Sequence, residues 1–215
     1  MTIPPNPAPA FPRSLFVFSV LYGGMVCIAG VLGVKQVALG PLAVEAGIFG
    51  FLLLVVLSSA ISELHGQKTA TFLVRLGFIP LLVSAALIHL VLALPHDPGM
   101  YPPAIEAFPI VVGQSSRMMI AGLISYGISQ TLNVTIFAAL KGREGGGLLW
   151  LRAGIASALS QIVDTLLFVT IAFAGVFPIG ELLLGQMIAK VLLSAILVPP
   201  LIYLFVGLGR RLDRG

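Results

Sequence analysis

One short polar pattern occurs twice in this chain, each time inside a stretch that is otherwise apolar. The pattern is Ser-Gln-x-x-(Asn or Asp)-x-x-x-Phe, and its two copies comprise Ser129, Gln130, Asn133 and Phe137, and then Ser160, Gln161, Asp164 and Phe168. A side chain that can carry charge costs about 3 kcal/mol or more near the middle of a bilayer. We therefore expect Asp164 to be paired with a cation, to face a wet cavity, or both.

The spacing within each copy places its polar side chains together. Residues three apart share one face of a helix, so Gln161 lies beside Asp164, and Gln130 lies beside Asn133. A short glycine-rich turn over residues 142–147 separates the two copies, which predicts antiparallel helices and one shared cleft. Such a cleft could bind a flat, polar molecule. Alternatively, the amides could bridge helices directly, which is worth only about 0.6 kcal/mol per pair.

A cation is available at the same depth as Asp164. At 1.5 Å per residue, Asp164 lies about 20 Å into its apolar stretch, and Lys190 lies about 14 Å into the last one from the other side. A Lys190–Asp164 pair could simply fix the register of two helices. Ser129, Thr131 and Gln186 lie at similar depth, which is more polar atoms than one ion pair needs, so a binding site is favoured.

Two further charged residues are candidates for the site. Glu63 ends an apolar stretch in Ser62-Glu63-Leu64-His65-Gly66, where an acid could be a boundary residue or a gate, and the boundary role is the commoner one. Arg117 opens another apolar stretch and could contact substrate or extend toward the membrane surface. No metal-ligand spacing, glycine-rich phosphate loop or nucleophile motif occurs, so neither a metal, a cofactor nor an enzyme is predicted.

The composition identifies the class of protein that must position these side chains. Hydrophobic residues make up 58% of the 215 residues, charged residues only 9%, and the mean hydropathy is +1.09, which is typical of an integral membrane protein. Apolar windows long enough to cross the bilayer predict an all-α bundle of six transmembrane helices. The predicted spans are residues 14–34, 46–62, 71–94, 118–140, 149–177 and 181–207, and they form one polytopic domain over 14–207 between tails at 1–13 and 208–215.

The distribution of cations predicts the orientation of this bundle. Nine cations fall on one side of the six spans, and short loops rich in Lys and Arg stay in the cytoplasm. They are Arg13, Lys68, Arg75, Lys141, Arg143, Arg152, Arg210, Arg211 and Arg214. Only Lys35 and Arg117 fall on the other side, so both termini are predicted to be cytoplasmic. The net charge of +4 follows from this bias and predicts no nucleic-acid partner. The proline-rich segment 95–116 is predicted to be an irregular or re-entrant cap on the outer side.

From about residue 30 to residue 206 the chain resembles the queuosine-precursor transporters of the vitamin uptake transporter group. The resemblance rests on Gly33-Val34-Lys35, Ser62-Glu63-Leu64-His65-Gly66, Arg117, Ser129-Gln130-x-x-Asn133, Trp150-x-Arg152, Ser160-Gln161-x-x-Asp164-Thr165 and Lys190. Two positions depart from the family pattern, which usually has Asp where this chain has Ser59 and Asn133. These departures bear on the form of the substrate and on proton coupling.

The resemblance implies a multi-pass protein of the bacterial inner membrane that imports 7-cyano-7-deazaguanine, or its aminomethyl derivative, for salvage synthesis of queuosine. The implied substrate-binding residues are Asp164, Gln161, Gln130, Asn133, Glu63, Lys190 and Arg117. The preferred deazapurine, the energy source and a homodimeric state stay open. An alternative is a substrate-binding subunit of an ATP-driven uptake complex, with Ala29 and Gly33 as a small-residue docking face.

Overall fold

The computed structural model describes residues 12–39, 42–113, 116–141, 148–176 and 179–214. Within these ranges, six helical segments are long and apolar enough to cross a membrane. They are α1 (Arg13–Leu32), α2 (Gly47–His65), α3 with α4 (Gln67–Leu76 and Phe78–Ala93), α6 (Ser116–Ala139), α7 (Leu149–Phe173) and α8 (Gly180–Leu212). The predicted polytopic helical bundle is therefore confirmed. The glycine-rich turn and Arg143 lie outside the described residues.

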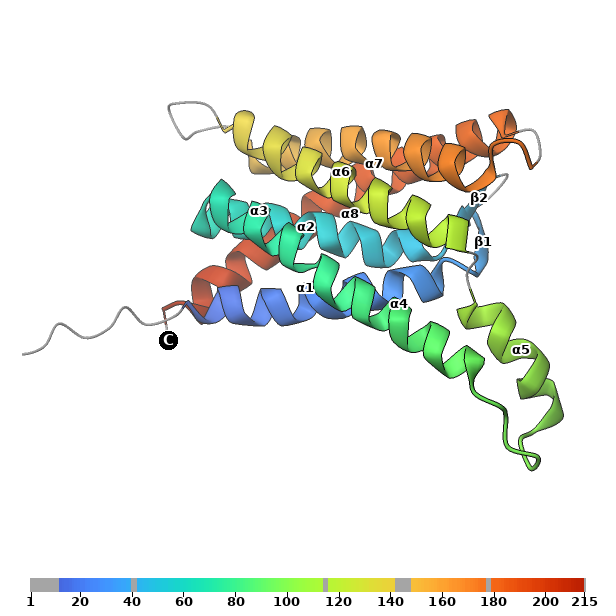
Figure 1. Cartoon of the computed structure of the whole chain (residues 1–215). Helices are drawn as coiled ribbons and strands as arrows, with labels where there is room; N and C mark the ends of the chain where they lie inside the picture. Colours follow the sequence, from blue (N-terminus) through green and yellow to red (C-terminus); the bar gives the residue numbers. More distant parts are fainter. Residues whose placement is uncertain (1–11, 40–41, 114–115, 142–147, 177–178, 215) are drawn as a thin grey trace, which may run out of the picture.

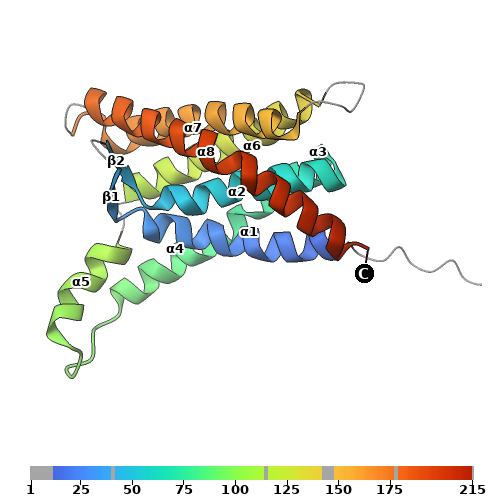
Figure 2. The ribbon, with the colours of Figure 1, turned by 180° about the vertical axis from the view of Figure 1, so that it is seen from behind.

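Helix α2 lies at the centre of the bundle and contacts α1, α3, α6, α7 and α8 (Figure 1). Its sequence is apolar on every side, which is typical of a helix buried in a core. From Val55 to Ser62 every one of its residues is buried. Helices α6 and α7 run side by side in opposite directions along one flank, as the short connection between them predicts, and α8 crosses in front of α2 in the view of Figure 2.

The third predicted span is not one continuous helix, because it is divided at Gly77 into α3 and α4. Pro80 in the first turn of α4 has no N–H to donate to the preceding turn, which favours a break there. The hydroxyl of Tyr126 donates to the carbonyl oxygen of Val74 at 3.1 Å, and the hydroxyl of Tyr22 lies 3.0 Å from that of Tyr126. A tyrosine pair from two other helices thus supports the break.

Two elements differ from the sequence-based prediction of an all-helical chain. A short antiparallel hairpin, β1 (Gln36–Leu39) paired with β2 (Leu42–Glu45), connects α1 to α2. The segment predicted to be irregular contains an 11-residue helix, α5 (Pro102–Val112), which begins at a proline, a residue well suited to the first turn of a helix. At about 16 Å it is too short to span a bilayer. Together, α4 and α5 form an arm that extends away from the bundle (Figure 1).

The start of α1 and the end of α8 meet at the end of the bundle opposite the hairpin. The backbone N–H and hydroxyl of Ser14 donate to the two carboxylate oxygens of Asp213 at 2.9 and 2.6 Å. The Nε2 atom of His65 lies 2.7 Å from the same hydroxyl. These contacts join the start of α1, the end of α2 and the residue after α8. The start of α1 and the residue after α8 are therefore on one side of the bundle, and the assignment of both termini to the cytoplasm stays a prediction.

The packing at Gly77 predicts the cost of adding a single methyl group. A Cβ atom at this position would overlap the Tyr126 hydroxyl, which Tyr22 and Val74 hold in place. We expect Gly77→Ala to destabilise the protein by about 1–3 kcal/mol in detergent unfolding experiments, the usual cost of overpacking. Gly24→Ala is the matched control, because no atom lies within 4 Å of a Cβ there. Equal stability of the two variants would contradict the packing at the break.

The contacts at Asp213 predict a pH-dependent contribution to stability. Partial desolvation raises the pKa of Asp213, but the two hydrogen bonds from Ser14 and the neighbouring His65 outweigh it and lower the pKa below its usual value. The stabilisation is then complete above the unfolded-state pKa of about 3.9 and is lost as pH falls through the lower folded-state value. We expect wild type to melt above Asp213→Asn at neutral pH and the two melting temperatures to converge in acid. A constant difference would contradict this assignment.

Candidate functional site

A cavity of about 310 Å³ lies in the half of the bundle nearest the hairpin, a volume at the lower end of the range for small-molecule sites. All six membrane-length segments contribute to its wall. Most of the lining is apolar, and Phe168 lines it while contacting Phe173 edge-on at 6.2 Å between ring centroids. The polar lining residues are Glu45, Ser84, Ser125, Tyr126, Gln161, Asp164 and Lys190.

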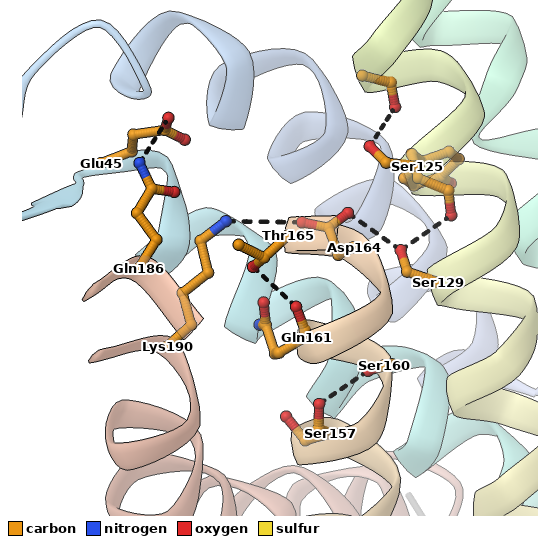
Figure 3. Close-up of polar contacts among 12 residues, drawn as sticks. Glu45, Ser125, Ser129, Ser157, Ser160, Gln161, Asp164, Thr165, Gln186 and Lys190 are labelled. Atoms are coloured by element: carbon orange, nitrogen blue, oxygen red, sulfur yellow. Dashed lines mark hydrogen bonds and ion pairs between the residues drawn. The ribbon is translucent and has the colours of Figure 1, made fainter. Parts of the chain in front are cut away.

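Asp164 and Lys190 form the predicted ion pair in the wall of this cavity (Figure 3). The Lys190 Nζ atom lies 3.7 Å from Oδ2 of Asp164, and the Ser129 hydroxyl donates to Oδ1 at 3.2 Å. Both charged residues are buried, with 7% and 5% of their surface exposed. The ion pair is longer than the 2.7–2.9 Å of a charged hydrogen bond. It joins α7 to α8, while Ser129 ties the same carboxylate to α6.

Gln161 lies one turn before Asp164 on the same face of α7, as its spacing predicts. Its side chain is 1% exposed, and neither the amide nitrogen nor the amide oxygen has a hydrogen-bond partner among the described residues. An unpaired buried polar group costs about 1–3 kcal/mol. Because Gln161 lines the cavity, a bound molecule could supply the missing acceptor and donor.

Sequence reasoning missed Glu45, the last residue of β2. Its carboxylate accepts a hydrogen bond of 3.3 Å from the amide nitrogen of Gln186, which lies one turn before Lys190 on α8. Gln186 was recognised from its depth, but Glu45 falls between two predicted spans and its sequence context contains no motif. The one sequence signal that could have indicated Glu45 is its position as an acid directly before an apolar helix.

The first copy of the repeated pattern faces α2 in this conformation. The Asn133 amide nitrogen lies within 3.3 Å of the Val55 carbonyl oxygen and within 3.2 Å of the hydroxyls of Ser58 and Ser59. The Ser58 hydroxyl lies 3.5 Å from the amide oxygen of Gln130. Neither Gln130 nor Asn133 lines the cavity. The two copies of the pattern therefore have different neighbours, and substrate binding by the first copy stays a prediction.

Glu63 belongs to an ionic cluster near the end of α2, away from the cavity. Its carboxylate oxygen lies 2.8 Å from a guanidinium nitrogen of Arg152 and 3.4 Å from the Lys141 ammonium. Arg152 is 4% exposed, and its guanidinium carbon lies 4.4 Å from the centroid of the Phe137 ring. Arg152 is thus a buried partner of Glu63 as well as a cation on the predicted cytoplasmic side.

Arg117 caps the end of α7 instead of lining the cavity. Its Nε and Nη2 atoms donate to the carbonyl oxygens of Ile171 and Ala174, each at 2.6 Å. A cation at a helix C-terminus satisfies free carbonyl groups and interacts favourably with the helix dipole. Its predicted contact with substrate stays a prediction. Of the seven predicted site residues, the cavity wall therefore brings together Asp164, Gln161 and Lys190.

A family model described as "Putative vitamin uptake transporter" matches residues 45–205. The chain belongs to this family. A protein of Bacillus subtilis (strain 168) named "Probable queuosine precursor transporter" is 30% identical over 146 residues, which cover 67% of this chain and 63% of the relative. The match thus spans less than two thirds of that relative. No solved structure matches the chain significantly.

Family membership and the six apolar helices make this chain a multi-pass membrane protein of a transporter family. The ATP-driven alternative gains no support from the comparisons. Its suggested docking face, Ala29 and Gly33, packs within the chain against Gly47, where an added Cβ would overlap the carbonyl oxygen of Ala29 and crowd Gly33. Ala29 also packs against Gly50. These small residues bring α1 and α2 close together.

The ionic cluster predicts that loss of Glu63 destabilises the protein more than loss of Lys141. Glu63→Gln leaves a buried guanidinium without its counter-ion and should destabilise the protein by about 3 kcal/mol. Lys141→Gln removes the half-exposed cation of the same cluster and should cost less than about 1 kcal/mol. Denaturant unfolding in detergent micelles measures both. Similar losses for the two variants would show that burial of Arg152 does not dominate the cluster.

Proposed function

We propose that this protein imports a queuosine precursor, 7-cyano-7-deazaguanine or its aminomethyl derivative, across the bacterial inner membrane. The name of the Bacillus subtilis relative supports this class of substrate. The observation that carries the proposal is the unpartnered amide of Gln161 beside the Asp164 carboxylate in a cavity of about 310 Å³. This arrangement suits a flat molecule with hydrogen-bond donors and acceptors along one edge.

The chemistry of a deazaguanine matches these groups. Its ring N–H and exocyclic amine are donors, and a carbonyl acceptor adjoins them on the same edge. The Asp164 carboxylate can accept both donors, since an ionised carboxylate has two acceptor oxygens. The amide nitrogen of Gln161 can then donate to the carbonyl group, and its oxygen accepts a further N–H. The apolar wall, including Phe168, would pack against the faces of the ring.

Lys190 has a supporting role in this proposal. Its ammonium group lies 3.7 Å from Asp164, and the pairing lowers the cost of burying the two groups. The ammonium group also offers a donor to the substrate carbonyl on the side facing α8. The same ion pair therefore fixes helix register and lines the cavity, so the structural and functional roles that the sequence left open are compatible.

Three of the remaining predicted site residues, Gln130, Asn133 and Glu63, would act in the passage of substrate beyond the cavity. Two groups of contacts follow one another along α2 on the side away from the hairpin. The first joins Asn133 and Gln130 to Ser58, and the second joins Arg152 to Glu63. An exit toward that side requires these contacts to separate. Gln130, Asn133 and Glu63 are then gate residues that meet the substrate after it leaves Asp164.

Uptake of labelled 7-cyano-7-deazaguanine and of its aminomethyl derivative by proteoliposomes containing only this protein tests the proposed function. Accumulation would establish a self-sufficient carrier, and its response to an imposed pH gradient would report proton coupling. Binding without uptake would indicate a missing partner, as in an ATP-driven complex. Absence of both binding and uptake for both compounds would overturn the assignment of substrate.

Gln161 allows binding to be separated from folding. Its side chain has no hydrogen-bond partner among the described residues, so Gln161→Leu removes no hydrogen bond seen there and should leave the melting temperature unchanged or raised. Substrate affinity should fall by about 10- to 100-fold, the equivalent of one or two buried hydrogen bonds. Thr135→Val, an exposed position on α6 outside the cavity, is the control. A destabilised variant with normal affinity would contradict the proposed role.

A further inference from the structure

The cavity contains an acid that the ion pair does not neutralise. Glu45 ends β2, where the hairpin backbone is held by the bond from the Ala46 N–H to the Lys35 carbonyl oxygen at 2.8 Å, and the preceding Val44 is fully buried. The carboxylate of Glu45 therefore projects from a fixed backbone into the cavity wall. In Figure 3 its side chain meets that of Gln186, with Lys190 on the next turn reaching toward Asp164.

The charges that line the cavity do not balance. Among the described lining residues, two can be anionic, Glu45 and Asp164, and one is cationic, Lys190. Lys190 lies 3.7 Å from Asp164, whereas no described cation lies within 4.0 Å of Glu45. The partner of Glu45 is the neutral amide of Gln186. The described lining of the cavity thus has one acid more than it has cations, and that acid lies near the hairpin.

Gln186 and Lys190 are four residues apart and so lie on one face of α8, about 6 Å apart along its axis. Their partners, Glu45 and Asp164, are consequently spaced along the same wall. A molecule whose polar edge contacts Asp164 and Gln161 could reach Glu45 with a short substituent. Glu45 would then contact the substituent, whereas Asp164 and Gln161 contact the polar edge of the ring.

We infer that Glu45 determines specificity by binding a cationic substituent of the substrate, so that the site prefers the aminomethyl deazapurine to the cyano compound. This inference rests on the proposed function. A primary amine on a methylene group is protonated at neutral pH, and it would donate charged hydrogen bonds to the Glu45 carboxylate. A nitrile offers only an acceptor, and an ionised carboxylate is acceptor-only, so the cyano compound gains nothing at this position.

The role of Gln186 follows from the same geometry. Its amide nitrogen donates to one oxygen of Glu45, which orients the carboxylate and leaves the other oxygen for the substrate. The amide oxygen of Gln186 is buried and has no partner among the described residues. A protonated amine, with three N–H groups, could donate to this oxygen and to Glu45 together.

The test compares the affinities of both deazapurines for purified wild-type protein, Glu45→Gln and Glu106→Gln. Glu106 is an exposed acid on α5 outside the cavity and controls for the loss of one charge. We expect wild type to bind the aminomethyl compound more tightly. Glu45→Gln should weaken that binding about tenfold or more, as expected for loss of a close charge pair, and change the affinity for the cyano compound less than about twofold. Glu106→Gln should match wild type.

Three results would overturn the inference. Equal weakening of both compounds in Glu45→Gln would assign this residue a general or structural role, which its melting temperature would reveal. Unchanged affinities would remove Glu45 from the site while leaving the proposed function intact, because wild type would still bind a deazapurine. Absence of binding of either compound to folded wild type would reject the proposed function itself and, with it, this inference.

Discussion

The absence of water in the membrane interior is the constraint on which this structure depends, because every buried polar atom must find its partner within the protein. Helix α2 shows how the chain meets this demand. Along its length, polar contacts occur at successive levels with different helices: Ser58 and Ser59 with Asn133 of α6, Glu63 with Arg152 of α7, and His65 with Ser14 of α1. These contacts fix the axial positions of helices that apolar packing alone would allow to slide.

Buried side-chain atoms that have no partner among the described residues therefore indicate where a ligand could bind. Among the described residues that line the cavity, Gln161 has two unpaired side-chain atoms, and nearby Gln186 has one. Both lie beside carboxylates, Asp164 on α7 and Glu45 on β2. Away from the cavity, Gln130 and Asn133 each have one unpaired side-chain atom among the described residues, but the other polar atom of each has a partner in α2. A binding site in a membrane protein must keep hydrogen-bonding capacity for its ligand, and the two unpaired side-chain atoms of Gln161 provide it.

The sequence predicted the features that depend on local spacing and on the free-energy cost of burying charged groups. Hydropathy located six spans, and the estimated depths of Asp164 and Lys190 correctly brought them together, because two opposite charges at one depth strongly favour pairing. It did not predict which helix each polar face would meet. Gln130 and Gln161 occur in similar patterns, yet one faces α2 and the other faces the cavity, because helix rotation is set by packing across the bundle. The break at Gly77 and the role of Glu45 likewise depend on residues distant in the sequence, Tyr126 and Gln186.

The two departures from the resembled family pattern gain a physical meaning in the structure. Ser59 and Asn133, the positions at which the family usually has Asp, are in direct contact, with the Asn133 amide nitrogen 3.2 Å from the Ser59 hydroxyl. Two carboxylates at such a separation could not both be ionised, so an acid pair there would hold a proton. Replacing both acids by an amide and a hydroxyl removes the titratable groups and lets the amide nitrogen donate to the hydroxyl oxygen. The two departures are thus one compensated change at the level of α2 next to the cavity. Any proton coupling in this chain would have to use other acids, of which Asp164 and Glu45 line the cavity and Glu63 is held by Arg152.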